Sequence, residues 1–139
     1  MNALYTAEAT AWGGREGRAT TSDSSIDVQL SIPKGMGGPE TPGTTNPEQL
    51  FATGYAACFH SAFKLMASKA GVDVSESAIT AQVDIGVLDG GGFGLAVRLQ
   101  VEVAGVERAV VEDLMAQAHQ VCPYSNATRG NIDVQLSVV

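Results

Sequence analysis

Charged, aromatic and cysteine residues are all scarce in this chain. Of its 139 residues 17% are charged and 6% are aromatic, two are cysteines, and the formal net charge is −7. Binding to nucleic acid or to an anionic membrane surface depends on clustered positive charge, so the scattered basic residues argue against both partners. No apolar run approaches the ~20 residues of a membrane span, and residues 1–5 lack the charged start of a signal peptide. We therefore expect a cytoplasmic protein, in which permanent structural disulfides are rare.

Apolar residues, in contrast, are plentiful for so short a chain. They make up 45% of the sequence, which is typical of a folded protein and enough for one core of ordinary size. The length predicts a single domain over residues 1–139. Because few charged residues are left to cover the surface, we expect part of that surface to be buried in an oligomer.

Alternating and helical patterns of apolar residues divide the chain into strands and helices. The expected strands cover residues 3–12, 26–32, 79–88, 93–103 and 132–138, and the expected helices cover residues 47–70 and 106–121. The glycines at 90–92 predict that two of these strands form a hairpin. The segment 33–45, rich in Gly, Pro and Thr, is expected to be a long loop, and such loops are often functional.

The helix expected over residues 47–70 carries the strongest local signals. Asn46 is a candidate N-cap, Pro47 fits the first turn, and Gly71 fits the end. The helix is apolar on almost every side, and helices of that kind are usually buried on every side. In a chain of this length, that pattern predicts a central helix covered by a sheet and by a partner subunit.

The two cysteines stand in different settings. Cys58 lies within the apolar helix, and Cys122 lies where the second helix ends, because Pro123 disfavours helical geometry in the residue before it. Free cysteines often simply pack in a core, so the pair is either inert or chemically active. The sequence spacing leaves both interpretations open.

Reduction of a peroxide by a thiol sets requirements that can be compared with the sequence. The thiolate is the nucleophile, and because burial raises the pKa of a thiol, a nearby cation must lower it. A second thiol must then condense with the sulfenic acid before further oxidation. Arginine suits the cation's role because it stays charged and can bind a carboxylate through two parallel hydrogen bonds. Arg15 lies in a glycine-rich turn, and the other candidates are Arg18, Arg98, Arg108 and Arg129.

Glu48 is the candidate carboxylate, with one alternative role. Residues 45–48 also fit a capping box, in which Glu48 would only close the start of the helix. About 15 Å separate Glu48 from Cys58 along a straight helix. Either the helix bends near Gly54, or another subunit or a folded-back loop completes the site.

The histidines raise two further possibilities. His60 and His119 join Cys58 and Cys122 as a set of zinc-ligand types. Cys58 and His60 point to nearly opposite sides of one helix, so they reach one metal ion only if that helix breaks. A cysteine hydrolase is also possible, but no local sequence signature supports it.

Several segments of the chain resemble one known family. They are GGR at 13–15, TNPEQLFA at 45–52, GYAACF at 54–59, AHQVCPYSNATRGN at 118–131 and the turn GGFGL at 91–95. These segments are similar to those of the organic hydroperoxide resistance (Ohr) proteins within the OsmC/Ohr family, and the resemblance covers nearly the whole chain. The long segment around Cys122 separates the Ohr group from its OsmC relatives.

The resemblance implies an α+β fold, an intertwined homodimer whose antiparallel sheets wrap two central buried helices. It implies that Cys58 is the peroxidatic cysteine and Cys122 the resolving cysteine, with Arg15 and Glu48 as the polar pair that activates Cys58. It further implies bulky apolar hydroperoxides as substrates, a disulfide reduced by dihydrolipoyl groups of lipoylated proteins, and no metal or prosthetic group.

Residue type alone suggests that Phe51, Phe59 and Met66 line a pocket for the alkyl tail of the peroxide, with plain core packing as the alternative. Two other functions stay open. One is an OsmC-type peroxidase with a different peroxide preference. The other is a non-enzymatic protein that binds an apolar ligand or senses oxidants by reversible thiol oxidation.

Overall fold

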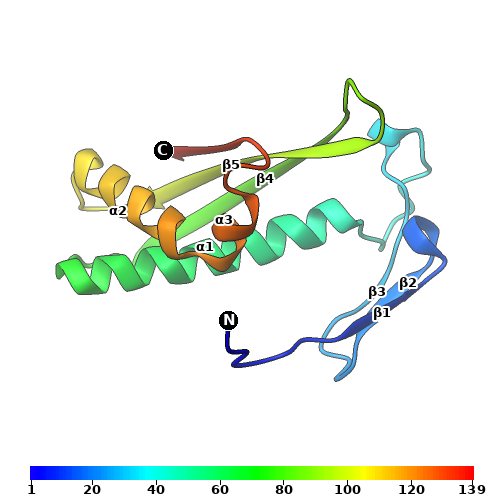
Figure 1. Cartoon of the computed structure of the whole chain (residues 1–139), viewed down its shortest axis with the longest axis horizontal. Coiled ribbons are helices and arrows are strands. Elements are labelled where there is room, and N and C mark those ends of the chain that lie inside the picture. The colour runs from blue at the N-terminus through cyan, green and yellow to red at the C-terminus, as the bar shows by residue number, and fades with distance from the viewer. The chain divides into compact units, whose positions relative to one another are not determined.

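The computed structural model describes all 139 residues and divides into two compact units, Met1–Leu50 and Phe51–Val139. The long helix α1 (Pro47–Ala70) begins in the first unit and runs through the second (Figure 1). Its bounds agree with the predicted helix. Asn46 caps it as predicted, because its side-chain oxygen accepts the backbone N–H of Gln49 at 2.8 Å. A single domain over residues 1–139 stays a prediction.

A three-stranded antiparallel sheet makes up most of the first unit. Its strands are β1 (Ala9–Trp12), β2 (Arg18–Thr21) and β3 (Asp27–Gln29), in that order. The short 3-10 helices η1 (Gly14–Glu16) and η2 (Lys34–Met36) lie in the connections. No residue of the three strands is buried, so this sheet has no core of its own.

The first unit differs from its sequence prediction in three ways. The strand expected over residues 26–32 is shorter, because β3 covers only Asp27–Gln29. One long strand is expected over residues 3–12, but only the last four residues of that segment pair with β2. The strand β2 itself is missed, because four residues are too short for an alternation of apolar side chains to be recognised. The long loop predicted over residues 33–45 contains η2 and no strand.

The second unit holds the other sheet and two further helices. The strands β4 (Ser77–Val87) and β5 (Phe93–Val103) form the predicted antiparallel hairpin, and β6 (Val134–Val138) lies beside β5. The helices α2 (Arg108–Val121) and α3 (Pro123–Thr128) connect β5 to β6.

Two details of this unit correct the sequence analysis. The expectation of antiparallel sheets is wrong for β6, which pairs with β5 in parallel. The crossover through α2 returns the chain to the end of the sheet where β5 began, so β6 runs in the same direction. Pro123 ends α2 as predicted but also starts α3, where its missing N–H costs no hydrogen bond.

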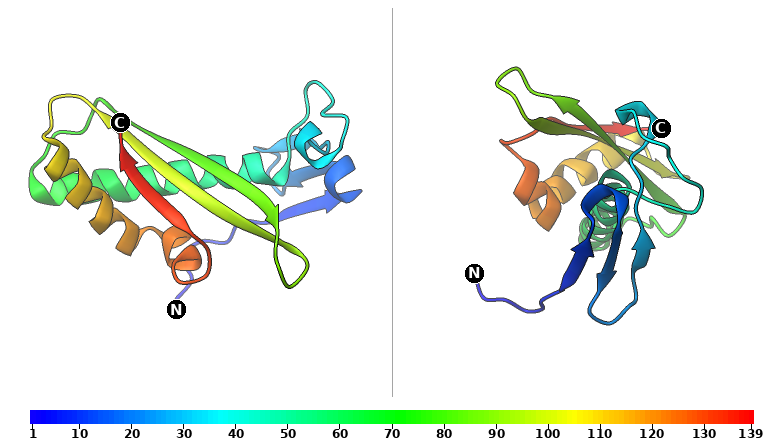
Figure 2. Two further views of the ribbon diagram at one scale, coloured as in Figure 1. Left: turned by 90° about the horizontal axis from the view of Figure 1, so that it is seen from above. Right: turned by 90° about the vertical axis from the view of Figure 1, so that its right-hand side faces the viewer.

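Both α1 and α2 cover the same face of the β4–β5–β6 sheet (Figure 2). The core between the sheet and the two helices draws on three elements, with Tyr55, Phe59 and Phe63 from α1, Val97, Leu99 and Val101 from β5, and Val111, Leu114 and Met115 from α2. The other face of the sheet is polar. There Arg98 of β5 pairs with Asp84 of β4.

Within one chain, α1 is buried on one side only. Its opposite side exposes the mostly small residues Thr53, Ala57, Ser61 and Leu65, the last with 50% of its surface accessible. The sheet thus covers one side of α1, and coverage of the other side by a partner subunit stays a prediction.

Candidate active site

Arg15 and Glu48 form a doubly hydrogen-bonded ion pair in the first unit. Nη1 of Arg15 lies 2.8 Å from Oε2 of Glu48, and Nη2 lies 2.6 Å from Oε1. Two parallel hydrogen bonds of this kind fix both the plane of the guanidinium group and the position of its charge. The hydrogen bond from Arg15 lowers the pKa of the Glu48 carboxyl, and the same contact raises the pKa of Arg15. Both groups are therefore charged at neutral pH.

The chain just after β3 brings these two partners together. The N–H of Leu30 donates to the carbonyl of Gly17, which follows η1, at 2.8 Å. The next N–H, of Ser31, donates to the carbonyl of Thr45, just before α1, at 3.0 Å. One extended segment thus aligns η1, with its arginine, beside the first turn of α1, with its glutamate. Only glycine fits position 17, since a Cβ there would lie 1.7 Å from the Trp12 carbonyl oxygen.

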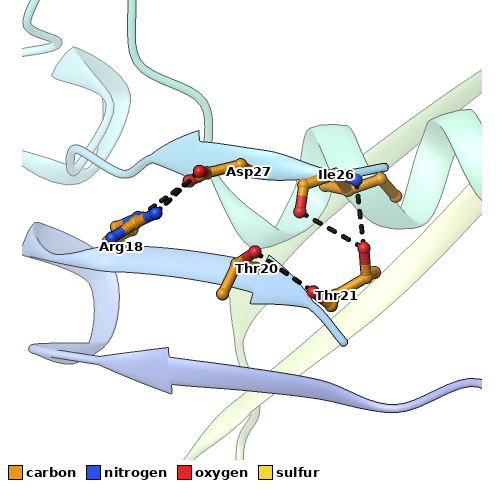
Figure 3. A network of polar contacts seen from close by, with 5 residues as sticks. All are labelled: Arg18, Thr20, Thr21, Ile26 and Asp27. Atoms are coloured by element: carbon orange, nitrogen blue, oxygen red, sulfur yellow. Dashed lines mark hydrogen bonds and ion pairs between the residues drawn. The ribbon is translucent and has the colours of Figure 1, made fainter. Parts of the chain in front are cut away.

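The capping-box alternative for Glu48 is wrong. Asn46 is the cap, and the Glu48 carboxylate is bound by Arg15 instead. A similar pair joins Arg18 to Asp27 across β2 and β3 (Figure 3). The Asp27 side chain is 42% exposed and that of Glu48 only 13%, so water screens the charges of the Arg15 pair less.

Cys58 and Cys122 meet in the second unit. Their sulfur atoms lie 3.3 Å apart, and both cysteines are free thiols. A disulfide requires about 2.0 Å, so a small shift of either side chain allows the bond to form. Cys58 comes from the middle of α1, and Cys122 from the joint between α2 and α3.

The surroundings of the sulfur pair disfavour ionisation of Cys58. Burial raises the pKa of its thiol, the backbone N–H of Tyr124 lowers that pKa, and the adjacent Cys122 raises it again. The net effect is a raised pKa. Left to these contacts alone, Cys58 stays largely a thiol at neutral pH.

An aromatic cluster stands beside the sulfur pair. The rings of Phe51, Tyr55 and Tyr124 lie with centroids 5.6 to 5.9 Å apart. Gly54 makes room for this cluster, because a Cβ there would come within 2.7 Å of the Tyr124 hydroxyl. The helix α1 is continuous through Gly54, so the predicted alternative of a bend at this residue is wrong.

An open cavity of about 610 Å³ adjoins the aromatic cluster. Phe51 is part of its wall, and the other lining residues are Leu88, Phe93, Gly94, Leu95, Ala127, Thr128, Asn131, Ile132 and Asp133. Phe59 is fully buried in the core, Met66 is nearly so, and neither lines this cavity. The structure thus brings one of the three predicted tail-binding residues to a cavity and places the other two in the core.

The histidines are engaged elsewhere. Nε2 of His60 lies 2.9 Å from the Ser77 hydroxyl, and Nδ1 of His119 lies 2.8 Å from the Ser125 hydroxyl. No group of three or more His, Cys, Asp or Glu side chains is arranged to hold a metal ion. The predicted alternative of a zinc site made from the two cysteines and two histidines has no convergent set of ligands.

Residues 38–137 match the family model described as OsmC-like protein. Over 136 residues the chain is 54% identical to the organic hydroperoxide resistance protein of Xanthomonas axonopodis pv. citri. The matched region covers 97% of this chain and 94% of that protein. The chain belongs to the OsmC/Ohr family.

Solved structures of other OsmC/Ohr family members agree with this assignment. An organic hydroperoxide resistance protein from Elizabethkingia anophelis, with thiocyanate bound, matches with a TM-score of 0.93 and 48% identity, covering 99% of this chain and 98% of that one. A Vibrio cholerae homologue, with captopril in one of its active sites, matches with a TM-score of 0.91 and 50% identity, covering 99% and 94%. None of the helices of this family member has the length and apolar character needed to span a membrane.

Proposed function

We propose that this chain is a thiol-dependent peroxidase that reduces organic hydroperoxides to alcohols. The observation that carries the proposal is the 3.3 Å separation of the Cys58 and Cys122 sulfur atoms in a member of the OsmC/Ohr family. Two thiols this close can alternate with a disulfide without a rearrangement of the fold. The name shared by the relatives, organic hydroperoxide resistance protein, supports the class of substrate.

The proposed reaction has three steps. The Cys58 thiolate attacks the terminal oxygen of ROOH, the O–O bond breaks, and RO⁻ takes a proton and leaves as the alcohol, with Cys58 oxidised to a sulfenic acid. The Cys122 thiol then attacks the Cys58 sulfur, an S–S bond forms, and water leaves. A dithiol finally reduces the disulfide by exchange, which restores both thiols and oxidises the dithiol to its own disulfide.

The first step needs a cation, and Arg15 is our candidate, supplied by the same subunit or by its partner. The raised pKa of the Cys58 thiol requires a positive charge if the thiolate is to form at neutral pH. Arg15 is permanently charged, and its bonds to Glu48 hold its donor groups in one plane. In this proposal Glu48 is a positioning residue that acts through Arg15.

We place the alkyl tail of the substrate in the cavity beside the aromatic cluster. Its wall includes the apolar side chains of Phe51, Leu88, Phe93, Leu95 and Ile132, and it has the volume of a small-molecule site. The aromatic cluster links this wall to the sulfur pair, because Phe51 contacts Tyr124, whose backbone N–H is bonded to Cys58. The predicted contribution of Phe59 and Met66 to tail binding stays untested.

We infer that the protein works as an intertwined homodimer. The β1–β2–β3 sheet exposes Trp12 and buries no strand residue, and Ile26, just before β3, is exposed as well. A sheet of three strands needs a covered apolar face to be stable. The exposed side of α1, with Leu65 at 50%, offers a second surface for a partner. Sedimentation at micromolar concentration should give the mass of two chains, and a monomer mass would overturn this inference.

The proposed reductant is a dihydrolipoyl group carried by another protein in the cytoplasm. The site needs two electrons per cycle, and a dithiol delivers them by exchange with the Cys58–Cys122 disulfide. Dihydrolipoamide is therefore the reductant to test in turnover assays, with glutathione as the comparison.

The proposal is tested by intact mass of the reduced protein after one equivalent of cumene hydroperoxide. The expected result is the loss of two hydrogens, with Cys58 and Cys122 linked in the digest. An unchanged mass would show inert thiols and end the proposal.

Repeated turnover with dihydrolipoamide separates an enzyme from a sensor, which would react once. Faster turnover on cumene hydroperoxide than on hydrogen peroxide separates the Ohr preference from an OsmC-type one.

A further inference from the structure

Cys122 is held at the joint between two helices. Its N–H donates to the carbonyl of Ala118 in α2 at 2.9 Å, and its own carbonyl accepts the N–H of Asn126 in α3 at 2.9 Å. Cys122 is the C-cap of α2 and the N-cap of α3, and its backbone is extended. The direction in which its sulfur points is therefore set by how α3 is fixed against its neighbours.

A buried set of side-chain hydroxyl groups fixes α3. The Ser125 hydroxyl lies 2.8 Å from Nδ1 of His119 in α2 and 2.9 Å from the hydroxyl of Tyr55 in α1. The Tyr55 hydroxyl lies 3.0 Å from that of Thr128, at the far end of α3. Tyr55 and Ser125 are fully buried, and Thr128 is 5% exposed. Ser125 of α3 is thus tied both to α1, which carries Cys58, and to α2, which ends at Cys122.

The hydroxyl groups of this set satisfy one another. Thr128 lies within hydrogen-bond distance of the Ser125 carbonyl, at 3.3 Å, as well as of the Tyr55 hydroxyl. The contacts of Tyr55 with Ser125 and of Ser125 with His119 continue the set into α2. Each of the three hydroxyl groups therefore has two hydrogen-bond partners. No side-chain nitrogen or oxygen in the chain is buried without a partner.

The hydroxyl contact and the sulfur contact join the same two segments. Tyr55 precedes Cys58 by three residues on α1, which places both on one side of that helix. Ser125 follows Cys122 by three residues, and the contacts pair Tyr55 with Ser125 and Cys58 with Cys122. The Tyr55–Ser125 contact therefore lies one helical turn from the sulfur pair. A shift of Ser125 at this distance also shifts Cys122.

We propose that Ser125, held by Tyr55 and His119, is a positioning residue for the resolving thiol and sets how readily Cys58 is over-oxidised. The inference rests on the proposed peroxidase function. Once Cys58 is a sulfenic acid, two reactions compete. Attack by Cys122 gives the disulfide and water, and a second molecule of ROOH gives the sulfinic acid and another alcohol. The outcome depends on whether Cys122 Sγ is within reach when the sulfenic acid forms.

The test is the partition of oxidised protein between these two products. Reduced wild-type protein and the variants Ser125→Ala and Tyr55→Phe are titrated with cumene hydroperoxide without a reductant, and intact mass separates disulfide from sulfinic acid. In Ser125→Ala the peroxide concentration that gives half sulfinic acid should fall about tenfold, since a displacement of about 1 Å can cost up to about 100-fold in rate. Tyr55→Phe should lower it less, because His119 still holds Ser125.

A matched control separates positioning from general weakening of the fold. Ser77 makes the same kind of pair with His60, at 2.9 Å, and its hydroxyl donates to the carbonyl of Val74. Ser77→Ala should leave the partition within twofold of wild type, whatever it does to the Tm. His119→Ala should favour the sulfinic acid, and His119→Asn, which keeps a donor near the position of Nδ1, should restore the disulfide.

The outcomes are distinct. If Ser125→Ala and Ser77→Ala partition alike, or if His119→Asn behaves like His119→Ala, the positioning role is overturned. The role is also overturned if consumption of the Cys58 thiol slows as much as disulfide formation, because the network would then act on the whole site. If wild-type protein forms no disulfide at all, the proposed peroxidase function fails and not this inference alone.

Discussion

The ion pair of the first unit and the sulfur pair of the second have opposite electrostatic surroundings. Contacts with Glu48 raise the pKa of Arg15 and contacts with Arg15 lower that of Glu48, so both groups are held in their charged forms. Around Cys58, burial and the neighbouring thiol raise the pKa, and the neutral form is favoured. The charged pair is partly open to water, whereas Cys122 is completely covered.

This difference shows how the proposed work is divided. A sulfur pair in which Cys122 is buried and Cys58 is half-buried is suited to react with an alkyl peroxide and to close a disulfide, but it does not generate a thiolate by itself. The Arg15 pair supplies fixed charge but no nucleophile. The proposed chemistry therefore needs both units, and the variants below separate their contributions.

Removal of the nucleophile should have the largest effect. Cys58→Ser should lower the rate of cumene hydroperoxide reduction with dihydrolipoamide by at least about 1,000-fold, since loss of a catalytic nucleophile typically removes most of the rate enhancement. Cys122→Ser is the control, because it keeps the first oxidation and loses only the intramolecular disulfide. Comparable thiol consumption in Cys58→Ser and wild type would mean that Cys122 reacts first and that the two roles are reversed.

Removal of the charge should have the next largest effect. Arg15→Ala should slow oxidation of Cys58 at pH 7 by about 100-fold, because an opposite charge nearby lowers a pKa by roughly one to three units. Glu48→Gln should cost less, since the guanidinium stays charged but is held less firmly. The quantity to measure is the single-turnover rate of thiol loss.

The chain offers a matched control for the arginine. In the same unit, Arg18 makes an equally regular pair with Asp27, with contacts of 2.7 and 2.6 Å (Figure 3). Arg18→Ala should change the rate less than twofold. Equal losses in the two variants would show that the rate depends on the net charge of the unit and not on the position of Arg15.

Changes to the cavity should have a smaller, substrate-dependent effect. Leu95→Ala and Ile132→Ala each remove apolar lining, and each buried methylene is worth about 0.8 kcal/mol. The expected loss in kcat/KM for cumene hydroperoxide is about tenfold, with hydrogen peroxide unaffected because it has no tail. Parallel losses on both substrates would place the defect at the sulfur pair and remove the cavity from substrate binding.

The smallest expected effect is a difference in acid sensitivity between the two units. Burial lowers the pKa of His60 and His119 in the second unit, so the unfolded state binds more protons, and stability falls as the pH drops below about 6.5. In the first unit, hydrogen bonds lower the pKa of Glu48 and Asp27. That contribution is present above the ordinary carboxyl pKa of about 4 and is lost only below it.

Two spectroscopic probes separate the units in this experiment. The single tryptophan, Trp12, lies in β1 of the first unit, and the helical circular dichroism comes mostly from the second. On acidification, the helical signal should lose thermal stability between pH 7 and 5, before the tryptophan signal responds to carboxyl protonation. A double variant, His60→Gln with His119→Asn, should reduce the loss of thermal stability of the helical signal between pH 7 and 5. Coincident transitions at every pH would show that the two units unfold together.

Much of the fold could be predicted from the sequence where patterns are long. The helix α1 has a cap at Asn46 and unbroken apolar character, and the β4–β5 hairpin has clear alternation around three glycines. The parts that were missed are short or depend on distant partners. β2 has four residues, and the parallel direction of β6 follows from a crossover that local pattern does not encode.

The candidate site could be predicted only as residue types with a family resemblance. Spacing did not reveal that Cys58 and Cys122, 64 residues apart, would meet, nor that η1 would bring Arg15 to Glu48. Ser125 and Tyr55 were missed because single hydroxyl groups carry no periodic signal, although Pro123 could have indicated the start of α3. Phe59 and Met66 lie in the core, and their apolar type alone did not distinguish that placement from a pocket.

The central claim is that charge from the first unit converts the Cys58 thiol of the second into a thiolate. Its most direct test is the pH dependence of alkylation of Cys58 by iodoacetamide, in a Cys122→Ser background that leaves one reactive thiol. With Arg15 in place, alkylation should reach half of its maximal rate at a pH below the ordinary thiol pKa of about 8.5. When Arg15→Ala is added, the pH of half-maximal rate should rise above that value. A pH of half-maximal rate above about 8.5 with Arg15 in place, or one that Arg15→Ala leaves unchanged, would contradict the claim.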